Sequence, residues 1–296
     1  MLKRLPILCF ALLTLAACSH DSNSPAPAAS APSSSASAPV QAPAAATPGP
    51  AAAGTAAAAS TAAPSSAPAA TSTAASTAPA TPADVPAFVE DPKWVEGKNY
   101  FRIEPAQPKV SNTDKVEVAE VFSYACPSCN NFHPMVDQLA KSLPSYAVMA
   151  YLPVSFIPQE NFPMFQRAYL TAQALGVAEK ANGAMYDAVW KSKELSSERA
   201  DGQGLKPMSD LPKIEDAAKV YAKFGVDPKE FVAVANSFSI NTQAKRADQL
   251  VKAYGVEGTP TIVIDGKYRI DGPSAGGYAQ MVELAKYLAA KEAAGK

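Results

Sequence analysis

The sequence has little net charge, few cysteines and almost no histidine. Its 296 residues include 26 basic and 27 acidic side chains, four cysteines and two histidines, for a formal net charge of −1. This balance argues against a general polyanion-binding protein, which needs a large basic surplus. After the first residues, no run approaches the roughly 18 apolar residues of a membrane-spanning helix. We therefore expect no nucleic-acid partner and no spanning helix beyond the leader.

The start of the chain predicts a secreted protein with a lipid anchor. Lys3 and Arg4 precede a short apolar stretch that ends in small residues, so residues 1–17 are typical of a signal peptide. Residues 15–18 read LAAC and resemble a bacterial lipobox, in which the cysteine is lipidated and becomes the mature N-terminus. We expect Cys18 to carry the lipid and to hold the protein at a membrane. An ordinary signal peptide that happens to contain Cys18 is the alternative.

Residues 18–87 predict a disordered tether behind the lipid. From Ser19 to Pro82, 57 of the 64 residues are Ala, Pro, Ser or Thr, and eleven prolines interrupt the Ala-rich runs. Such a segment buries too little apolar surface to offset its conformational entropy. Its contour length is up to about 200 Å, at roughly 3.1 Å per residue. The tether would give the folded part reach from a membrane, and a low-complexity insertion of no required length is the alternative.

Residues 88–296 predict one α/β domain, with a helical block of about 157–255 in its middle. The apolar patterns predict strands at 100–104, 116–123, 147–154, 261–264 and 267–270, and helices at 127–143 and around 281–288. The helix at 127–143 would bury a stripe of Phe132, Met135, Val136 and Leu139, and one helix of the block would bury Phe165, Ala168, Tyr169 and Ala172. Residues 194–212 predict a loop between helical stretches. Asp265-Gly266 between two strands is typical of a type I′ hairpin, because that turn needs positive φ at both positions. The order β, βαβ, helical block, ββα predicts a thioredoxin fold with an inserted helical domain.

The two cysteines of the folded part predict redox chemistry. Cys126-Pro127-Ser128-Cys129 lies between a predicted strand and a predicted helix. At that junction Cys126 meets the unpaired N–H groups and the positive end of the helix, which lower the pKa of a thiol. Pro127 suits the first helical turn because its missing N–H leaves no unpaired donor. Cys129, one turn further on, should be more buried and should close a disulfide with Cys126.

Two other uses of this cysteine pair fit the sequence less well. A structural zinc site needs four ligands, whereas the folded part offers one histidine, His133, and a carboxylate such as Asp137. A cysteine protease would need His133 as its base, but His133 lies two helical turns from Cys126. We therefore expect no metal, no other cofactor, and a solvent-exposed helix position for His133.

The stretch Phe122 to Cys129 (FSYACPSC) resembles the active site of the DsbA family of thiol:disulfide interchange proteins. The stretch 255–261 (GVEGTPT) resembles the second hallmark of that family, a loop that ends in a cis-proline, here Pro260. The resemblance covers about residues 95–290, and the leader and tether resemble those of membrane-anchored members.

The resemblance implies a thiol:disulfide oxidase of the bacterial cell envelope, facing the periplasm. Its partners would be reduced or unfolded exported proteins and a quinone-linked membrane reoxidase of the DsbB type, and it would act as a monomer. A substrate thiolate would attack Cys126, and the backbone of Thr259 beside Pro260 would pair with the substrate. Glu120 matches a buried acid that moves a proton to or from Cys129 in the family. An ordinary polar strand residue is the alternative for Glu120.

Two departures from the family pattern bear on the redox poise. Ser128 stands where many members have histidine, and Tyr151 stands where the buried acid often has a lysine partner. A disulfide isomerase or reductase on the same fold is the first rival function, because Thr259 before the cis-proline suits it as well as an oxidase, although the tether offers no dimerisation domain. A non-catalytic lipoprotein that binds a partner through its helical domain is the second rival.

Overall fold

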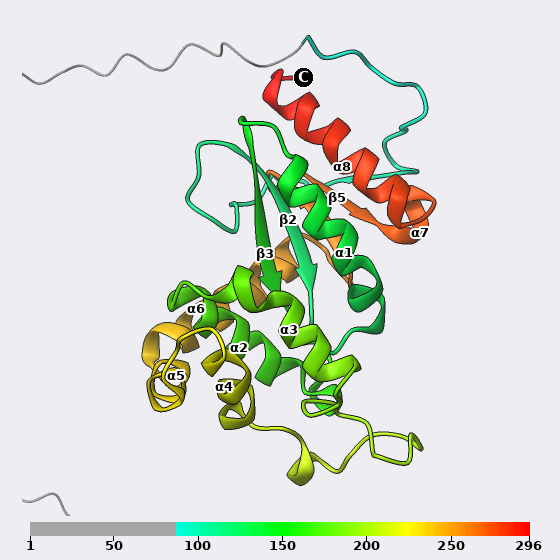
Figure 1. Ribbon diagram of the computed structural model, residues 1–296. Helices are drawn as coiled ribbons and strands as arrows, with labels where there is room; N and C mark the ends of the chain where they lie inside the picture. Colours follow the sequence, from blue (N-terminus) through cyan, green and yellow to red (C-terminus); the bar gives the residue numbers. More distant parts are fainter. Residues whose placement is uncertain (1–86) are drawn as a thin grey trace, which may run out of the picture. The chain divides into compact units, whose positions relative to one another are not determined.

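A computed structural model describes residues 87–296, and the predicted signal peptide, Cys18 and most of the tether lie outside this part of the chain (Figure 1). The described chain forms a five-stranded sheet in the order β1-β5-β4-β2-β3. The strands are β1 (Phe101–Arg102), β2 (Val116–Phe122), β3 (Ala147–Pro153), β4 (Thr261–Ile264) and β5 (Tyr268–Asp271). β2 and β3 are parallel, and the other three pairs are antiparallel. The predicted fold class, a thioredoxin fold with inserted helices, is confirmed.

The βαβ unit places the cysteine motif at one end of the sheet. Helix α1 (Pro127–Ser142) connects β2 to β3, as the sequence predicts. Phe132, Val136 and Leu139 of its predicted apolar stripe are buried. Met135 does not join them, because 38% of this residue is exposed. The buried stripe includes Cys129 instead, so the side of the helix that packs into the core carries the second cysteine of the motif.

The β4–β5 hairpin has the predicted turn. Asp265 and Gly266 adopt φ of 51° and 67°, the double positive φ of a type I′ turn. A side chain at position 266 would collide with the carbonyl oxygen of Gln107, 2.0 Å from the site of a Cβ, so only glycine fits there. The first strand is shorter than the predicted 100–104, because only two residues pair with β5.

The helical insertion occupies the chain between β3 and β4. It contains α2 (Phe162–Ala174), α3 (Ala178–Trp190), α4 (Ile214–Ala222), α5 (Pro228–Ala235) and α6 (Phe238–Ala253), with short 3₁₀ helices η1 (Pro158–Glu160) and η2 (Met208–Asp210). As predicted, irregular chain fills most of the interval between α3 and α4. The predicted apolar face of α2, which contains Phe165, Ala168, Tyr169 and Ala172, is buried.

A separate hydrophobic core lies on each face of the sheet. Val118 of β2 packs with the buried face of α1 and with α8 (Tyr278–Ala293), which follows the short helix α7 (Gly272–Ala275). Ala119 and Val121 point the other way and join the core that contains the helical insertion. Among residues 87–296, no helix is both long and apolar enough to span a bilayer. The active-site end of β2 therefore lies where the two parts of the domain meet (Figure 1).

Candidate active site

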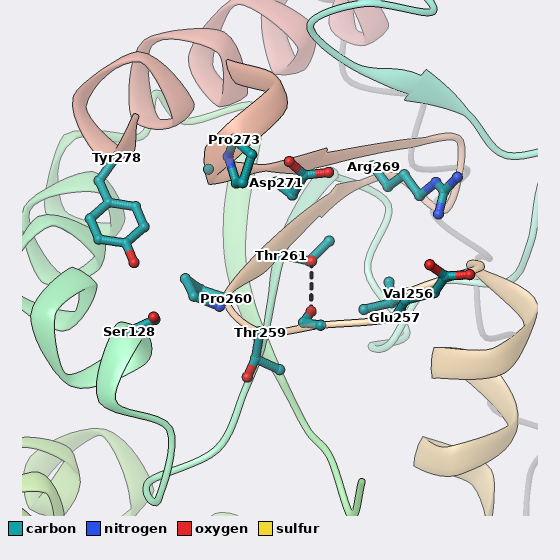
Figure 2. Close-up of a pocket in the computed structure, with 12 residues that line it drawn as sticks. Ser128, Val256, Glu257, Thr259, Pro260, Thr261, Arg269, Asp271, Pro273 and Tyr278 are labelled. Atoms are coloured by element: carbon teal, nitrogen blue, oxygen red, sulfur yellow. Dashed lines mark hydrogen bonds between the residues drawn. The ribbon is translucent and has the colours of Figure 1, made fainter. Parts of the chain in front are cut away.

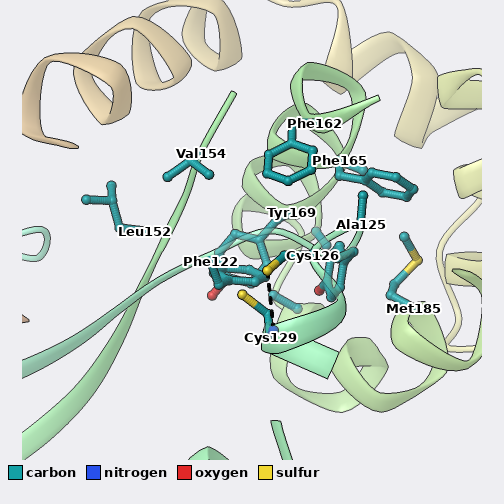
Figure 3. Close-up of a cluster of buried hydrophobic side chains, with 14 of the residues drawn as sticks. Phe122, Ala125, Cys126, Cys129, Leu152, Val154, Phe162, Phe165, Tyr169 and Met185 are labelled. Atoms are coloured by element: carbon teal, nitrogen blue, oxygen red, sulfur yellow. Dashed lines mark hydrogen bonds between the residues drawn. The ribbon is translucent and has the colours of Figure 1, made fainter. Parts of the chain in front are cut away.

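Cys126 caps the N-terminus of α1. Its backbone is extended, with φ −79° and ψ 118°, and Pro127 occupies the first helical turn. The backbone N–H of Cys129 donates to the Cys126 sulfur over 3.4 Å (Figure 3). Both cysteines are free thiols in this structure and both are buried, Cys126 with 6% and Cys129 with none of its surface exposed. The sulfur of Cys126 thus lies where the unpaired N–H groups of the helix stabilise an anion.

The two thiols have opposite electrostatic environments. A hydrogen bond from the Cys129 side chain lowers the pKa of Cys126 to about 6, against the opposing effect of burial. Weaker contributions come from the Thr259 side chain and from the backbone N–H groups of Cys129 and Ser128. Burial raises the pKa of Cys129 well above its ordinary value, and the neighbouring Cys126 and Glu120 raise it further. Near neutral pH the pair therefore holds one thiolate, on Cys126, and one thiol, on Cys129.

The predicted cis-proline loop at 255–261 lies against the cysteine motif at 126–129. The Thr259–Pro260 peptide bond is cis, as the sequence led us to expect. The carbonyl oxygen of Thr259 lies 3.4 Å from the Cys126 sulfur, although 133 residues separate them in the chain. Positions 126 and 259 thus form one site.

A groove of about 590 Å³ runs beside this cis-proline. Ser128 and Tyr278 lie on one side of Pro260, and Glu257 and Arg269 lie on the other (Figure 2). The guanidinium of Arg269 donates to the carbonyl of Gly255 and so ties β5 to the loop. The groove gives an extended peptide access to the backbone beside the sulfur.

Glu120 is buried beneath the cysteine pair. It alternates with Val118 and so lies on the face of β2 that α1 covers, and its neighbour in register on β3 is Tyr151. Burial raises the pKa of Glu120 to about 8, and the charges of Asp137 and Cys126 contribute. Among the described residues, its Oε1 atom has no hydrogen-bond partner. Glu120 is therefore a carboxyl group that is largely protonated near neutral pH and senses the charge on Cys126.

His133 does not occupy the exposed position that we expected from the sequence. Its ring stacks on Tyr186 of α3 with centroids 4.6 Å apart, and burial lowers its pKa. The prediction failed because helical spacing does not reveal that α3 covers this side of α1. Asp137 lies 3.6 Å away from His133. Within residues 87–296 there is no cluster of three His, Cys, Asp or Glu side chains that could hold a metal ion.

A layer of aromatic side chains surrounds the site, and the sequence analysis did not predict it. Phe122, Tyr124, Tyr169 and Tyr186 pack edge to face or tilted, with centroid distances of 5.0 to 6.4 Å. Phe122 and Tyr169 lie close to the two sulfurs (Figure 3). The indole N–H of Trp190 donates to the carbonyl of Tyr124 over 2.8 Å, which anchors the turn before Cys126 to the insertion. No sequence pattern links residues 66 positions apart.

Known proteins are similar to this chain in sequence and in fold. The model of the DSBA-like thioredoxin domain family matches residues 117–289. The thiol:disulfide interchange protein DsbA of Pseudomonas aeruginosa is 34% identical over 202 residues, which cover 68% of this chain and 87% of that protein. Its counterpart in Burkholderia cepacia is 31% identical over 64% of this chain and 82% of its own length.

Solved structures give the same result. The crystal structure of Pseudomonas aeruginosa DsbA has a TM-score of 0.58 and 33% identity, over 68% of this chain and 96% of that one. The oxidoreductase NmDsbA3 from Neisseria meningitidis has a TM-score of 0.52 and 26% identity, over 67% of this chain and 97% of that one. The family match spans most of the described domain, including the cysteine pair and the cis-proline loop. The chain therefore belongs to the DSBA-like thioredoxin domain family and is a thiol:disulfide oxidoreductase.

Proposed function

We propose that this chain introduces disulfide bonds into reduced exported proteins through Cys126 and Cys129. The observation that carries the proposal is the asymmetry of the two thiols. The pKa of Cys126 is lowered to about 6, whereas that of Cys129 is raised by burial. A stabilised thiolate is a good leaving group, so the reduced form is favoured and the oxidised form gives up its disulfide readily.

The reaction transfers two electrons from the substrate to the disulfide. A substrate thiolate attacks the Cys126 sulfur, the Cys126–Cys129 bond breaks, and a mixed disulfide forms while Cys129 takes up a proton. A second substrate thiolate then attacks the substrate sulfur of the mixed disulfide. The new substrate disulfide leaves, and Cys126 departs as the thiolate. The substrate is oxidised by two electrons and the enzyme pair is reduced by two.

Three neighbouring residues would assist these steps. The backbone of Thr259 would pair with the extended substrate, and Pro260 would hold that backbone open toward Cys126. Glu120 would exchange a proton with Cys129, because its pKa of about 8 leaves it able to give or accept a proton near neutral pH. In this scheme the loop residues Pro127 and Ser128 shape the helix start and face the substrate.

The reduced enzyme needs an electron acceptor. We infer a membrane reoxidase of the DsbB type that passes the electrons to quinone and acts on a monomer of this protein. The thiolate of Cys126 would attack the partner's disulfide in the reverse of the substrate reaction. The reaction requires no cofactor bound to this chain.

We further propose that the protein is lipid-anchored on the periplasmic side of a membrane. Residues 1–17 would be the signal peptide, Cys18 would carry the lipid, 18–87 would form the tether, and 88–296 would be the catalytic domain. The LAAC sequence at 15–18 supports this proposal. Replacing Cys18 with serine should release the protein from the membrane fraction or block its processing. Full recovery of a mature Cys18→Ser protein in the membrane fraction would contradict the anchor.

Three assays on the full chain separate the oxidase from its rivals. We expect the oxidised protein to form disulfides in reduced ribonuclease. The reduced protein, with dithiothreitol as the electron donor, should reactivate scrambled ribonuclease and reduce insulin more slowly. Cys126→Ala should abolish the oxidase activity. Faster reactivation of scrambled ribonuclease than oxidation of the reduced enzyme would favour an isomerase. Equal behaviour of wild type and Cys126→Ala in all three assays would favour a non-catalytic binding protein.

A further inference from the structure

A second cavity meets the active-site turn from the side of the helical insertion. It has a volume of about 150 Å³ and shares no lining residue with the groove beside Pro260. Ala125 and Pro127, the two chain neighbours of Cys126, line one side of it. Val189, Trp190 and Leu205 of the insertion also line it. The nucleophilic cysteine therefore lies between two hollows of different character.

Hydrogen bonds within the protein hold the walls of this cavity in place without a substrate. The hydrogen bond from the Trp190 indole to the Tyr124 carbonyl sets the orientation of the indole ring. Leu205 lies on a small hairpin, where it pairs with Glu198 in an antiparallel bridge. Backbone hydrogen bonds of 2.9 and 2.8 Å close that hairpin. Leu205 is nevertheless 40% exposed, so part of its side chain stays open at the cavity that Ala125 and Pro127 also line.

The lysines around the cavity already have partners within the protein. Lys193 pairs with Glu198 at 3.0 Å and lies over the Trp190 ring at 5.3 Å. The ammonium of Lys206 donates to the Ser196 carbonyl over 2.7 Å. Glu160 also lines the cavity, so an acidic side chain is disfavoured there. Ser196 and Ser197 line it too, but the hydroxyl of Ser197 donates to the Glu160 carbonyl and that of Ser196 accepts from the Glu198 N–H. The rest of the lining is apolar and recognises shape and hydrophobicity.

We propose that this cavity receives one aliphatic side chain of the reduced substrate, from a residue next to the reacting cysteine. The proposal rests on the function proposed above and extends it to substrate preference. A cavity of about 150 Å³ is large enough for a group of benzene size, and its apolar wall of Ala125, Pro127, Val189, Trp190 and Leu205 suits one leucine, isoleucine or methionine. Because Ala125 and Pro127 flank Cys126, a substrate in the groove beside Pro260 has its neighbouring residue at the mouth of the cavity. Leu205 is then a specificity-determining residue.

The test compares dithiol peptides with leucine, alanine or aspartate on either side of the first cysteine. The oxidised full chain is mixed with each peptide, and the rate constant for peptide oxidation is measured. At one of the two positions we expect leucine to exceed alanine by about tenfold, because three buried carbons are lost in a half-open site. Leu205→Ser should reduce this ratio to about twofold. The matched control is Met208→Ser, which changes an exposed residue of the same loop that does not line the cavity and should keep the ratio.

A binding measurement separates a failure of this inference from a failure of the proposed function. The chain has two tryptophans, so Trp94→Phe leaves Trp190 as the only indole reporter. Peptides with serine in place of both cysteines are titrated while Trp190 emission is followed. A lower dissociation constant for the leucine peptide, lost in Leu205→Ser, supports the cavity even if no peptide is oxidised. A leucine preference that Leu205→Ser leaves unchanged, or no preference at either position in both measurements, overturns the proposal.

Discussion

The thioredoxin part and the helical insertion contribute different things to the site. The thioredoxin part, formed by the sheet with α1 and α8, contains Cys126, Cys129, Thr259 and Glu120. The insertion contains no cysteine, but it packs Tyr169 and Tyr186 around the sulfurs and places Trp190 behind the preceding turn. The reacting atoms thus come from one part, and much of their environment comes from the other.

This division explains why the pKa values of two thiols one helical turn apart shift in opposite directions. Cys126 lies at the helix N-terminus, where the Cys129 side chain and, more weakly, the backbone N–H groups favour its anion. Cys129 lies within the core that the insertion completes, and burial there disfavours its anion. Local geometry lowers one pKa, and packing between distant segments raises the other. The comparison predicts that changes in the two parts have separable effects.

The largest effect should come from the sulfurs of the thioredoxin part. Cys126→Ser should abolish oxidation of reduced ribonuclease, because no sulfur remains for the substrate to attack. Cys129→Ser should instead accumulate mixed disulfides through Cys126, which gel electrophoresis without reductant detects as larger species. Residual oxidation by Cys126→Ser above the rate of buffer alone would place the reactive sulfur elsewhere.

Glu120 should couple the stability of the domain to pH. Its pKa is about 8 in the folded state and near 4.5 when exposed, so between these values the folded state binds the extra proton. Unfolding becomes easier as pH rises through this window, by about 4 kcal/mol from pH 5 to pH 8 at about 1.36 kcal/mol per unit. Glu120→Gln should remove this slope and stabilise the protein at pH 8.

The measurement is urea denaturation of the oxidised protein at pH 5 and pH 8, because neither sulfur titrates in that form. Burial, the largest cause of the raised Glu120 pKa, is kept there, whereas the smaller effect of the Cys126 charge is lost. Replacement of the exposed Glu283 by glutamine serves as the control, since its side chain is 61% exposed and pairs only at the surface. Equal pH slopes for wild type and Glu120→Gln would mean that Glu120 is solvated in the folded protein.

The insertion should affect stability without setting the chemistry. Trp190→Phe removes the hydrogen bond to the Tyr124 carbonyl and should cost about 2 kcal/mol of unfolding free energy. The pKa of Cys126 should stay near 6, because Trp190 is not among the groups that shift it. A change of a full unit in that pKa would show that the insertion tunes the sulfur directly.

A change at Ser128, the second of the two residues between the cysteines, should have the smallest effect, a shift in the reduction potential. Ser128→His adds an imidazole that can carry a full positive charge, so it should lower the pKa of Cys126 by about one unit. Each unit of thiolate stabilisation raises the reduction potential by up to about 30 mV in this two-electron couple. Glutathione equilibration of both proteins measures the difference. An unchanged potential would mean that position 128 does not set the redox poise.

The thioredoxin part was largely predictable because its signals are local. Cys126 and Cys129 are the two ends of one four-residue motif. The dipeptide Asp265-Gly266 specifies its own turn, because both residues adopt positive φ angles. The cis-proline at Pro260 came from a family motif of seven residues. These features depend on neighbours in the chain, so the sequence reveals them.

The insertion's contacts were not predictable because they join distant segments. His133 was expected at an exposed position, yet Tyr186 covers it from 53 positions away. Met135 matched the helical stripe, but the sheet lies on the side of Cys129 and leaves Met135 partly exposed. The contact of Trp190 with Tyr124 follows no periodicity. Tertiary packing decides such contacts, and a single sequence does not encode them in its spacing.

The ionisation of Cys126 tests the central claim most directly. In the reduced full chain, thiolate absorbance should rise with a midpoint near pH 6, because the Cys126 pKa is lowered to about 6 and that of Cys129 is raised. Cys126→Ser should lose this transition entirely. Cys129→Ala should keep a transition at a higher pH, because the hydrogen bond from the Cys129 side chain is gone. A wild-type midpoint near 9, the ordinary value of a thiol, would contradict the account.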